Sequence, residues 1–370
     1  MRNFGIFYFA LFVLSALSPA HLKAQTISLT KIASLGPEVS ETSGLLNIDG
    51  RIFTHNDSGN KAELYELDTL SGAVKRKIIV ANASNIDWED LSSDDNFIYI
   101  GDFGNNKGDR KNLRIYRVSR EQLLFSENLL ADTISFSYND QKTFSSSLYS
   151  TNFDAESFIV GESNIYVFTK NWGNFKTNIY KLPSAPGNYQ AIKIDSLNVN
   201  GLVTCATYNA NDKSLVLAGY TFSAFSEDFL CTVYFDKGNA DLLQRFSINN
   251  ATGIQIEGIC QSGNHYYLSN ETSSVLSASL FKISLLELLT GLSATKTNKN
   301  IISGPVNNLL HILDGNKYQI SIFDSSGKKM FYGTLSSITT HDWPRGLYIA
   351  HIINTEMNYT SVEKLFVGHE

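Results

Sequence analysis

The sequence predicts an all-β protein, with a β-propeller of five or six blades followed by a small C-terminal β-sandwich domain. Three observations lead to this fold class. A short motif recurs through the middle of the chain, and short alternating strands follow each copy. The composition is rich in aromatic residues and poor in proline, with 23 Phe, 18 Tyr and 6 Pro among 370 residues. Repeated short strands are typical of propellers, and this composition favours an extracytoplasmic β-protein.

The first 24 residues are typical of a cleavable secretion signal. Arg2 supplies a positive charge, and an apolar run follows from Phe4 to Leu17. The run is shorter than the roughly 20 apolar residues that span a bilayer, and small residues at Ser18-Pro-Ala20 and Ala24 fit cleavage. We therefore expect residues 1–24 to be removed, leaving a mature chain without a transmembrane segment. The alternative is that this segment stays uncleaved as an N-terminal anchor.

Five copies of a starting motif define the predicted blades between residues 40 and 292. The copies are 46 to 67 residues apart, close to the length of a four-stranded blade. The motifs are Glu41-Thr-Ser-Gly-Leu45, Asp87-Trp-Glu-Asp-Leu91, Asp154-Ala-Glu-Ser-Phe158, Leu202-Val-Thr-Cys-Ala206 and Gln255-Ile-Glu-Gly-Ile259. The expected second strands are Arg51–Asn56, Phe97–Asp102, Asn164–Thr169, Ser214–Gly219 and His265–Asn270. The expected third strands are Leu64–Leu67, Leu113–Val118, Asn178–Leu182, Leu230–Phe235 and Leu280–Ile283.

An N-terminal strand, Thr26–Ser34, has no hairpin partner nearby. We expect it to complete the last blade and close the ring, because closure removes exposed sheet edges. The long interval Ser119–Asn152 leaves six blades possible, and a two-sheet sandwich is the alternative fold. Ser284–Leu289 is consistent with a short helix or a final turn. The propeller is thus expected to span residues 25–292, with a polar linker at 293–300.

The last segment, residues 301–370, is predicted to form a separate β domain. Its expected strands are Leu309–Leu313, Tyr318–Asp324, Met330–Leu335, Gly346–Ile353 and Ser361–Val367, separated by Gly-, Asn-, Asp- and Pro-containing turns. An ordinary accessory β-sandwich would show the same alternation.

Specific motifs in this segment resemble the type A C-terminal sorting domain of type IX secretion. They are Asn308-Leu-Leu-His-Ile312, Tyr318–Lys329, Trp343-Pro-Arg-Gly-Leu-Tyr-Ile349 and Glu363-Lys-Leu-Phe-Val367. The resemblance implies that the outer-membrane translocon is a partner of residues 301–370. It also implies a secreted or outer-surface location, reached through the periplasm.

The charge of the chain argues against nucleic acid as a partner. Loss of residues 1–24 removes Arg2 and Lys23 but no acid, so the formal charge moves from −6 to −8. An acidic protein without a basic stripe repels phosphate backbones. The three cysteines, Cys205, Cys231 and Cys260, have no metal-type spacing, and we expect buried thiols, with one disulfide left open.

Acidic residues stand where the first strand of each blade should line the central channel. Alignment of the motifs places Ser43, Glu89, Glu156, Thr204 and Glu257 at one position, with Glu41, Asp87, Asp154, Leu202 and Gln255 two residues earlier on the same face. Like charges in a partly buried channel repel one another, so a cation, protonation or pairing with Lys170 and arginines must compensate. Carboxylates from several blades are a ligand set that Ca²⁺ accepts.

The residues assigned to a metal on this basis are Glu89, Asp154, Glu156 and Glu257. Those assigned to ligand binding follow the second strands or lie in the loops after them: Asp57, Asp102, Asn106, Arg110, Lys170, Asn270 and Glu271. The alternative is structural, because Asp and Asn often cap turns and accept hydrogen bonds from backbone amides at strand ends.

Two of the motifs, Asp154-Ala-Glu-Ser157 and Glu257-Gly-Ile259, are similar to blade starts of the phytase-like, SdiA-regulated and lactonase-type propellers. That similarity implies Ca²⁺-dependent hydrolysis in some members. The chain has no Gly-x-Ser-x-Gly, His-Glu-x-x-His or P-loop motif.

Three functions therefore remain open. The first is a secreted or surface propeller that binds a small-molecule, glycan or protein ligand, with Ca²⁺ as the candidate cofactor. The second is a cation-dependent hydrolase of a phosphoester or lactone. The third is a surface module that docks a glycan or protein.

Overall fold

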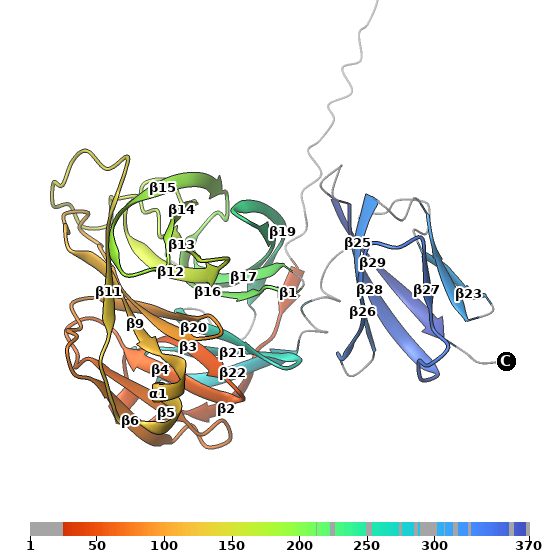
Figure 1. Ribbon diagram of the computed structural model, residues 1–370, viewed down its shortest axis with the longest axis horizontal. Coiled ribbons are helices and arrows are strands. Elements are labelled where there is room, and N and C mark those ends of the chain that lie inside the picture. The colour runs from red at the N-terminus through yellow and green to blue at the C-terminus, as the bar shows by residue number, and fades with distance from the viewer. Residues whose placement is uncertain are drawn as a thin grey trace, which may run out of the picture.

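The computed structural model describes residues 25–211, 213–222, 226–248, 254–273, 276–284, 288, 302–306, 308–313, 317–324, 327–354 and 359–367. The predicted signal peptide and linker lie outside these residues, as does most of the predicted helix 284–289, of which Leu288 is helical. Almost all of the regular secondary structure in the described chain is strand, as expected (Figure 1). None of its helices is long and apolar enough to cross a membrane.

Five four-stranded blades form a closed ring. From the innermost strand outward, the first blade contains β3 (Thr42–Ile48), β4 (Arg51–Asn56), β5 (Glu63–Leu67) and β6 (Val74–Val80), and the second contains β7 (Trp88–Ser93), β8 (Phe97–Asp102), β9 (Leu113–Ser119) and β11 (Asp132–Tyr138). The third blade contains β12 (Ala155–Gly161), β13 (Asn164–Thr169), β14 (Thr177–Pro183) and β15 (Gly187–Leu197), and the fourth contains β16 (Leu202–Asn209), β17 (Ser214–Tyr220), β18 (Asp228–Asp236) and β19 (Asn239–Ile248). The fifth blade contains β20 (Ile256–Ser262), β21 (His265–Asn270), β22 (Ser279–Ser284) and β2 (Thr30–Ser34). The innermost strands contact one another in the order β3, β7, β12, β16, β20 and back to β3. The predicted propeller is confirmed, and its blade number is five.

The N-terminal segment closes the ring, although as two strands rather than one. β2 pairs antiparallel with β22 and completes the fifth blade, as predicted. β1 (Gln25–Ile27) instead pairs parallel with β19 of the fourth blade. The segment therefore covers the outer sheet edges of the fourth and fifth blades before the chain enters the first blade.

The long interval after β9 is an outer connection, not a sixth blade. It holds α1 (Arg120–Phe125), β10 (Asn128–Leu129) and the blade-two strand β11. The side chain of Ser119 caps α1 by accepting a hydrogen bond from the backbone N–H of Gln122 at 3.3 Å. β10 pairs with β6 of the first blade, and β11 pairs parallel with β15 of the third blade, so blades two and three share one eight-stranded sheet.

Aromatic side chains fill the spaces between blades, which accounts for the unusual composition. Between blades two and three, Phe103 meets Phe158 edge to face with ring centroids 5.4 Å apart, and Tyr138 lies 4.5 Å from Tyr180. Such pairs add to the stability that their buried area already gives. The three cysteines are buried and free, in agreement with the sequence prediction.

Every innermost strand carries a β-bulge near its start. The residues left unpaired at the five register shifts are Gly44, Glu89, Glu156, Thr204 and Glu257. A bulge adds one residue to the strand and redirects its side chain. Three glutamates are therefore redirected at the same end of the channel. In blade one the bulged residue is Gly44, one position after the aligned Ser43, and its φ of 63° suits glycine.

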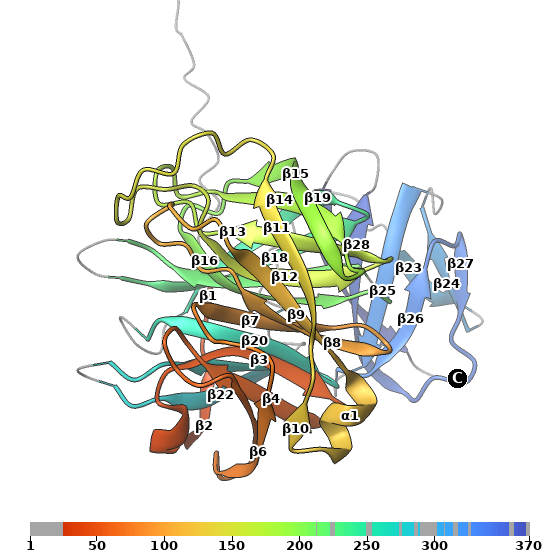
Figure 2. The same cartoon turned by 60° about the vertical axis from the view of Figure 1, so that its left-hand side comes forward.

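The C-terminal residues form a two-sheet sandwich beside the propeller (Figures 1 and 2). One sheet contains β23 (Ile302–Val306), β24 (Leu309–Ile312) and β27 (Ser337–Thr339), and the other contains β26 (Lys329–Gly333), β25 (Tyr318–Asp324), β28 (Gly346–Asn354) and β29 (Tyr359–Val367). Leu310, Ile320 and Ile352 are among the side chains buried between the sheets. Phe323 faces the other way and joins a hydrophobic cluster with Val216 and Tyr266 of the propeller.

Candidate functional site

One end of the channel, where the innermost strands begin, opens into an acidic cavity of about 440 Å³ that we call the acidic mouth. Seven of the eleven predicted site residues line it: Asp57, Glu89, Asn106, Glu156, Lys170, Glu257 and Glu271. They come from all blades except the fourth, which supplies Tyr220, Thr221 and Phe222 instead. The ring closure thus brings together groups as far apart in the sequence as Asp57 and Glu271.

Glu89 is the most buried member of a cluster of three carboxylates at the acidic mouth. Its side chain is only 5% exposed, and carboxylate oxygens of Asp57, Asp87 and Glu89 all lie within 4.8 Å of one another. Among the described residues, no hydrogen bond or ion pair involves its carboxylate. Burial, followed by the charges of Glu156, Asp57 and Asp87, raises its pKa well above the usual range. A buried carboxylate in this state needs a proton or a cation.

Asp87 and Asp57 share this difficulty. Burial and the charge of Asp57 raise the pKa of Asp87 to about 7. Burial likewise raises the pKa of Asp57 to about 6, against a hydrogen bond from the Ser58 backbone N–H. The nearest cation to Asp87 is Arg110, whose Nη1 lies 3.8 Å from Asp87 Oδ2. The three carboxylates are therefore held close together with little compensating positive charge.

A glycine in the loop after β8 permits this approach. The backbone N–H groups of Phe103 and Gly104 donate to the carbonyl of Asp87 at 3.0 and 3.2 Å, which brings the loop against the carboxylates. A Cβ atom on Gly104 would lie 1.9 Å from Glu89 Oε1 and 2.5 Å from Asp87 Oδ2. Any larger residue would occupy the space between these two side chains.

On another side of the acidic mouth, Lys170 neutralises Glu156. Lys170 Nζ lies 2.9 Å from Glu156 Oε1 and over the rings of Trp172 and Tyr220, at 5.1 and 5.5 Å from their centroids. Burial disfavours the charged lysine, but Glu156 and the other nearby acids outweigh it and raise the pKa of Lys170. Lys170 therefore keeps its proton and is already engaged by a carboxylate and two rings.

Burial also raises the pKa of Glu257 and Glu271, and in both cases the charge of a neighbouring acid adds to the effect. Acidic groups therefore face the cavity from the first, second, third and fifth blades.

Asp154, predicted as a metal ligand, supports the loops instead of lining the cavity. One carboxylate oxygen accepts a hydrogen bond from the Asn105 backbone N–H at 2.5 Å, and the other accepts one from Trp172 Nε1 at 2.8 Å. The bulge at Glu156 interrupts the alternation of β12, so Asp154 and Glu156 have different surroundings although they are two residues apart.

Three predicted ligand residues also lie outside the cavity lining. Asp102 accepts a hydrogen bond from the Asp87 backbone N–H at 3.1 Å and pairs with Arg110 at 3.0 Å. Arg110 also donates to the carbonyl of Gly104 at 2.7 Å. Asn270 Nδ2 donates to the Glu271 carbonyl at 2.7 Å. These contacts agree with the structural alternative, in which acids and amides hold the strand ends.

Aromatic residues on the acidic mouth were missed by sequence reasoning. Tyr149, Trp172 and Phe222 line the cavity with Tyr220, and the ring centroids of Tyr149 and Trp172 are 4.5 Å apart. Tyr149 comes from the long connection that follows β11, which has no strand periodicity. The one available signal was the Trp that follows Lys170 by two residues.

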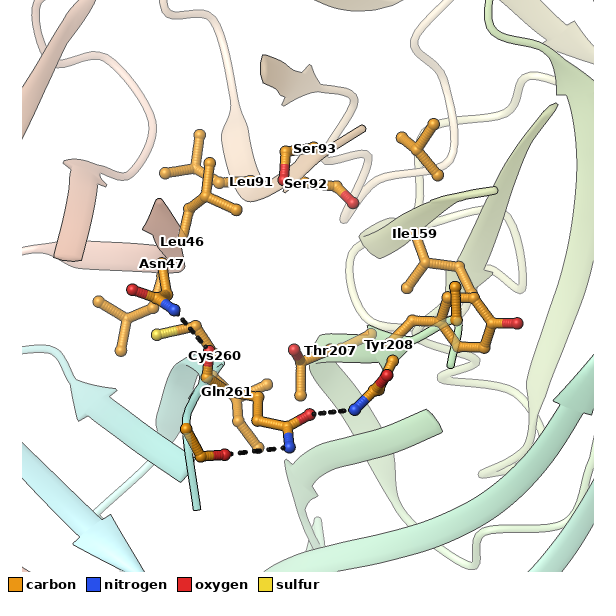
Figure 3. A pocket seen from close by; sticks show the side chains of 17 residues that line it. Leu46, Asn47, Leu91, Ser92, Ser93, Ile159, Thr207, Tyr208, Cys260 and Gln261 are labelled. Atoms are coloured by element: carbon orange, nitrogen blue, oxygen red, sulfur yellow. Dashed lines mark hydrogen bonds between the residues drawn. The ribbon is translucent and has the colours of Figure 1, made fainter. Parts of the chain in front are cut away.

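The opposite end of the channel is a second cavity of about 350 Å³, the neutral mouth (Figure 3). Its described lining has no acidic or basic residue and includes Leu46, Ser92, Ile159 and Tyr208. Asn47 Nδ2 donates to the Gln261 carbonyl at 3.0 Å across blades one and five. Figure 3 shows this bond and the neighbouring amide contacts around the opening.

Asp90 lies between the two mouths, one residue after Glu89 and one before Leu91. It is fully buried and accepts hydrogen bonds from the backbone N–H groups of Leu91 at 2.8 Å and Phe158 at 3.3 Å. Its carboxyl group thereby joins the neighbouring strands β7 and β12 of blades two and three. Burial raises its pKa well above the usual range, against the backbone hydrogen bonds that its carboxyl group accepts.

Comparison with solved structures gives only distant similarity. The tail fiber of Staphylococcus aureus phage P68 is 12% identical, with a TM-score of 0.38 over 93% of this chain and 78% of that chain. PorZ, a surface component of the type-IX secretion system of Porphyromonas gingivalis, is 10% identical, with a TM-score of 0.30 over 92% of this chain and 46% of its own. Apo AztD from Citrobacter koseri is 8% identical, with a TM-score of 0.32 over 89% and 87%. Structural similarity this distant says nothing about the activity of this protein.

None of the curated proteins matches the chain. Residues 301–368, by contrast, match the family model of the secretion system C-terminal sorting domain. This match covers the two-sheet sandwich and confirms the resemblance seen in its motifs. The C-terminal sandwich is therefore a type IX secretion sorting domain, and the protein is exported to the cell surface or the extracellular space.

Proposed function

We propose that the acidic mouth binds Ca²⁺ and, with it, an extracellular ligand. The observation that carries this proposal is the buried, unpaired carboxylate of Glu89 within 4.8 Å of Asp57 and Asp87 oxygens. A cation at this point removes the mutual repulsion of the three groups. Without one, the protein must keep protons on them.

Calcium is the cation that best fits the donor set. All three groups offer hard carboxylate oxygens, and Ca²⁺ takes oxygen ligands in flexible geometry. No cysteine or histidine lines the acidic mouth among the described residues, which disfavours softer metals. Export also takes the protein to a compartment that is richer in Ca²⁺ than the cytoplasm. The proposed ligands are Asp57, Asp87 and Glu89, so Asp87 joins the predicted set and Asp154 leaves it.

The remaining volume of the acidic mouth is available to a ligand. Glu257 and Glu271 face the same cavity as the proposed ion, and a cavity of about 440 Å³ lies within the range of small-molecule sites. The proposed role is binding. A hydrolase built on the same ion would in addition turn over phosphodiesters or lactones.

The test is metal analysis and thermal unfolding of the full chain in Ca²⁺, in Mg²⁺ and in EDTA. At a Ca²⁺ concentration of about 100 Kd, binding stabilises the fold by about 2.7 kcal/mol. Glu89→Gln removes this response and, since it removes a repelled charge, makes the metal-free protein more stable than the metal-free wild type. The matched control is Glu162→Gln, an exposed acid of the β12–β13 turn, which keeps the Ca²⁺ response.

A wild-type protein without bound metal and without a Ca²⁺-dependent shift contradicts the proposal. A response that survives Glu89→Gln places the ion elsewhere. Turnover of generic phosphodiester or lactone substrates, lost with Glu89→Gln, converts the binding role into the hydrolase alternative.

A further inference from the structure

One side of the acidic mouth is formed by three aromatic rings that all contact one another. The centroid of Trp172 lies 4.5 Å from that of Tyr149 and 5.4 Å from that of Phe222, and Tyr149 and Phe222 are 6.3 Å apart. Tyr149 is 51% exposed and Phe222 is 59% exposed, whereas Trp172 is 7% exposed. We call these residues the aromatic wall. Three clustered rings at a cavity, two of them open to solvent, are unlike the single exposed apolar residues that are common on protein surfaces.

Polar contacts hold two members of the aromatic wall, Trp172 and the backbone of Tyr149. Trp172 Nε1 donates to Asp154 at 2.8 Å, and the Trp172 backbone N–H donates to the Thr151 carbonyl at 3.0 Å. Tyr149 adopts a φ of 56°, which is unfavourable for a bulky residue, and its backbone N–H donates to the Asn106 carbonyl at 3.2 Å. A wall held in this way loses little conformational entropy when a ligand binds.

The charges of the side chains around the aromatic wall disfavour anionic ligands. Glu89, Glu257 and Glu271 share the cavity with the rings, and Lys170, the basic residue of the described lining, is already paired with Glu156. Carboxylates of this kind accept short, strong hydrogen bonds from hydroxyl groups. The cavity thus offers apolar ring faces on one side and hydroxyl acceptors on another.

A molecule that matches both surfaces has an apolar C–H face and several hydroxyl groups but no negative charge. We propose that the acidic mouth binds a neutral saccharide, one sugar ring of which lies against the aromatic wall while its hydroxyls reach the carboxylates and the proposed Ca²⁺. This inference rests on the proposed function and names the class of ligand. A cationic amine is the competing class, because it would replace Ca²⁺ at the carboxylates.

The experiment uses the full chain on a printed array of neutral, uronate-bearing and amino-sugar oligosaccharides in Ca²⁺, followed by titration of the best neutral glycan. The double variant Tyr149→Ala/Phe222→Ala is expected to weaken binding about tenfold or more, with its Ca²⁺-dependent thermal shift unchanged. Phe125→Ala, which removes an 82% exposed ring from α1, is the matched control and keeps wild-type affinity. The chain has 3 Trp, so the Trp172→Phe variant shows whether a change in fluorescence on binding comes from the aromatic wall.

The outcomes separate this inference from the proposed function. If wild-type protein shows no Ca²⁺ response, the proposed function fails. If the Ca²⁺ response is present but no neutral glycan binds, only the saccharide inference is overturned. Selective binding of uronates or amino sugars, or neutral-glycan binding that survives Tyr149→Ala/Phe222→Ala, overturns it as well.

Discussion

The two mouths of the propeller channel are formed by the same five strands but differ in chemistry. At the acidic mouth three of these strands carry a bulged glutamate near their start, and these glutamates have raised pKa values. At the neutral mouth the same strands continue into Leu46, Leu91 and Ile159, and amides bond across blades. The two ends of one channel thus differ in charge. Among the described residues, the acidic mouth carries the carboxylate cluster, and the neutral mouth is lined by uncharged side chains.

The largest expected difference between the mouths is their response to pH. Because the folded-state pKa values of Asp57 and Asp87 are raised to about 6 and about 7, their contribution to stability is present at low pH and is lost as pH rises through those values. In EDTA we expect the free energy of unfolding to fall by about 4 kcal/mol between about pH 5 and about pH 8. Denaturant unfolding at several pH values measures this loss, and Ca²⁺ should abolish it. Stability that is flat or rising over this range in EDTA would contradict the prediction.

A smaller loss is expected from Gly104→Ala. The added Cβ would lie 1.9 Å from Glu89 Oε1, so the carboxylates must move apart at a cost of about 2 kcal/mol. The Ca²⁺-dependent thermal shift should disappear with them. Gly346→Ala is the control, because its Cβ meets no atom within 4 Å. An unchanged Ca²⁺ response in Gly104→Ala would show that the ion does not lie between Asp87 and Glu89.

The smallest effect is expected at the neutral mouth, from Asn47→Ala. The substitution removes the hydrogen bond to the Gln261 carbonyl and the acceptor for the Gly50 backbone N–H, at a cost of about 1 kcal/mol. The loss should be the same at all pH values, and the Ca²⁺ response should stay intact. A pH-dependent loss would remove the distinction between the two mouths.

Most of the strand order could be predicted because each blade repeats the same apolar alternation. Arg51–Asn56, Phe97–Asp102 and Asn164–Thr169 are strands with the predicted bounds. The division of the N-terminal segment into β1 and β2 could not be predicted, since both pairings join residues more than 200 positions apart. Local periodicity carries no information about such partners.

The candidate site was predictable in part for the same reason. Repetition identified Glu89, Glu156 and Glu257 as equivalent, and all three line one cavity. Period-two alternation also placed Asp154 beside Glu156, but the bulge breaks that period and Asp154 supports Trp172 instead. Tyr149 lies in a connection without periodicity, and its place against Trp172 follows from the path of the loop.

The closure of the ring by β2 also sets the order in which the propeller can fold. β2 spans residues 30–34 and its partner β22 spans 279–284, so the last blade cannot form until nearly the whole propeller has been synthesised. Contacts between such distant segments form slowly, and edges that await their partner are prone to misassembly. We expect the N-terminal strands to be the last part of the ring to become protected from hydrogen exchange during refolding. A chain shortened by β2 would keep four complete blades and lose the ring's last pairing.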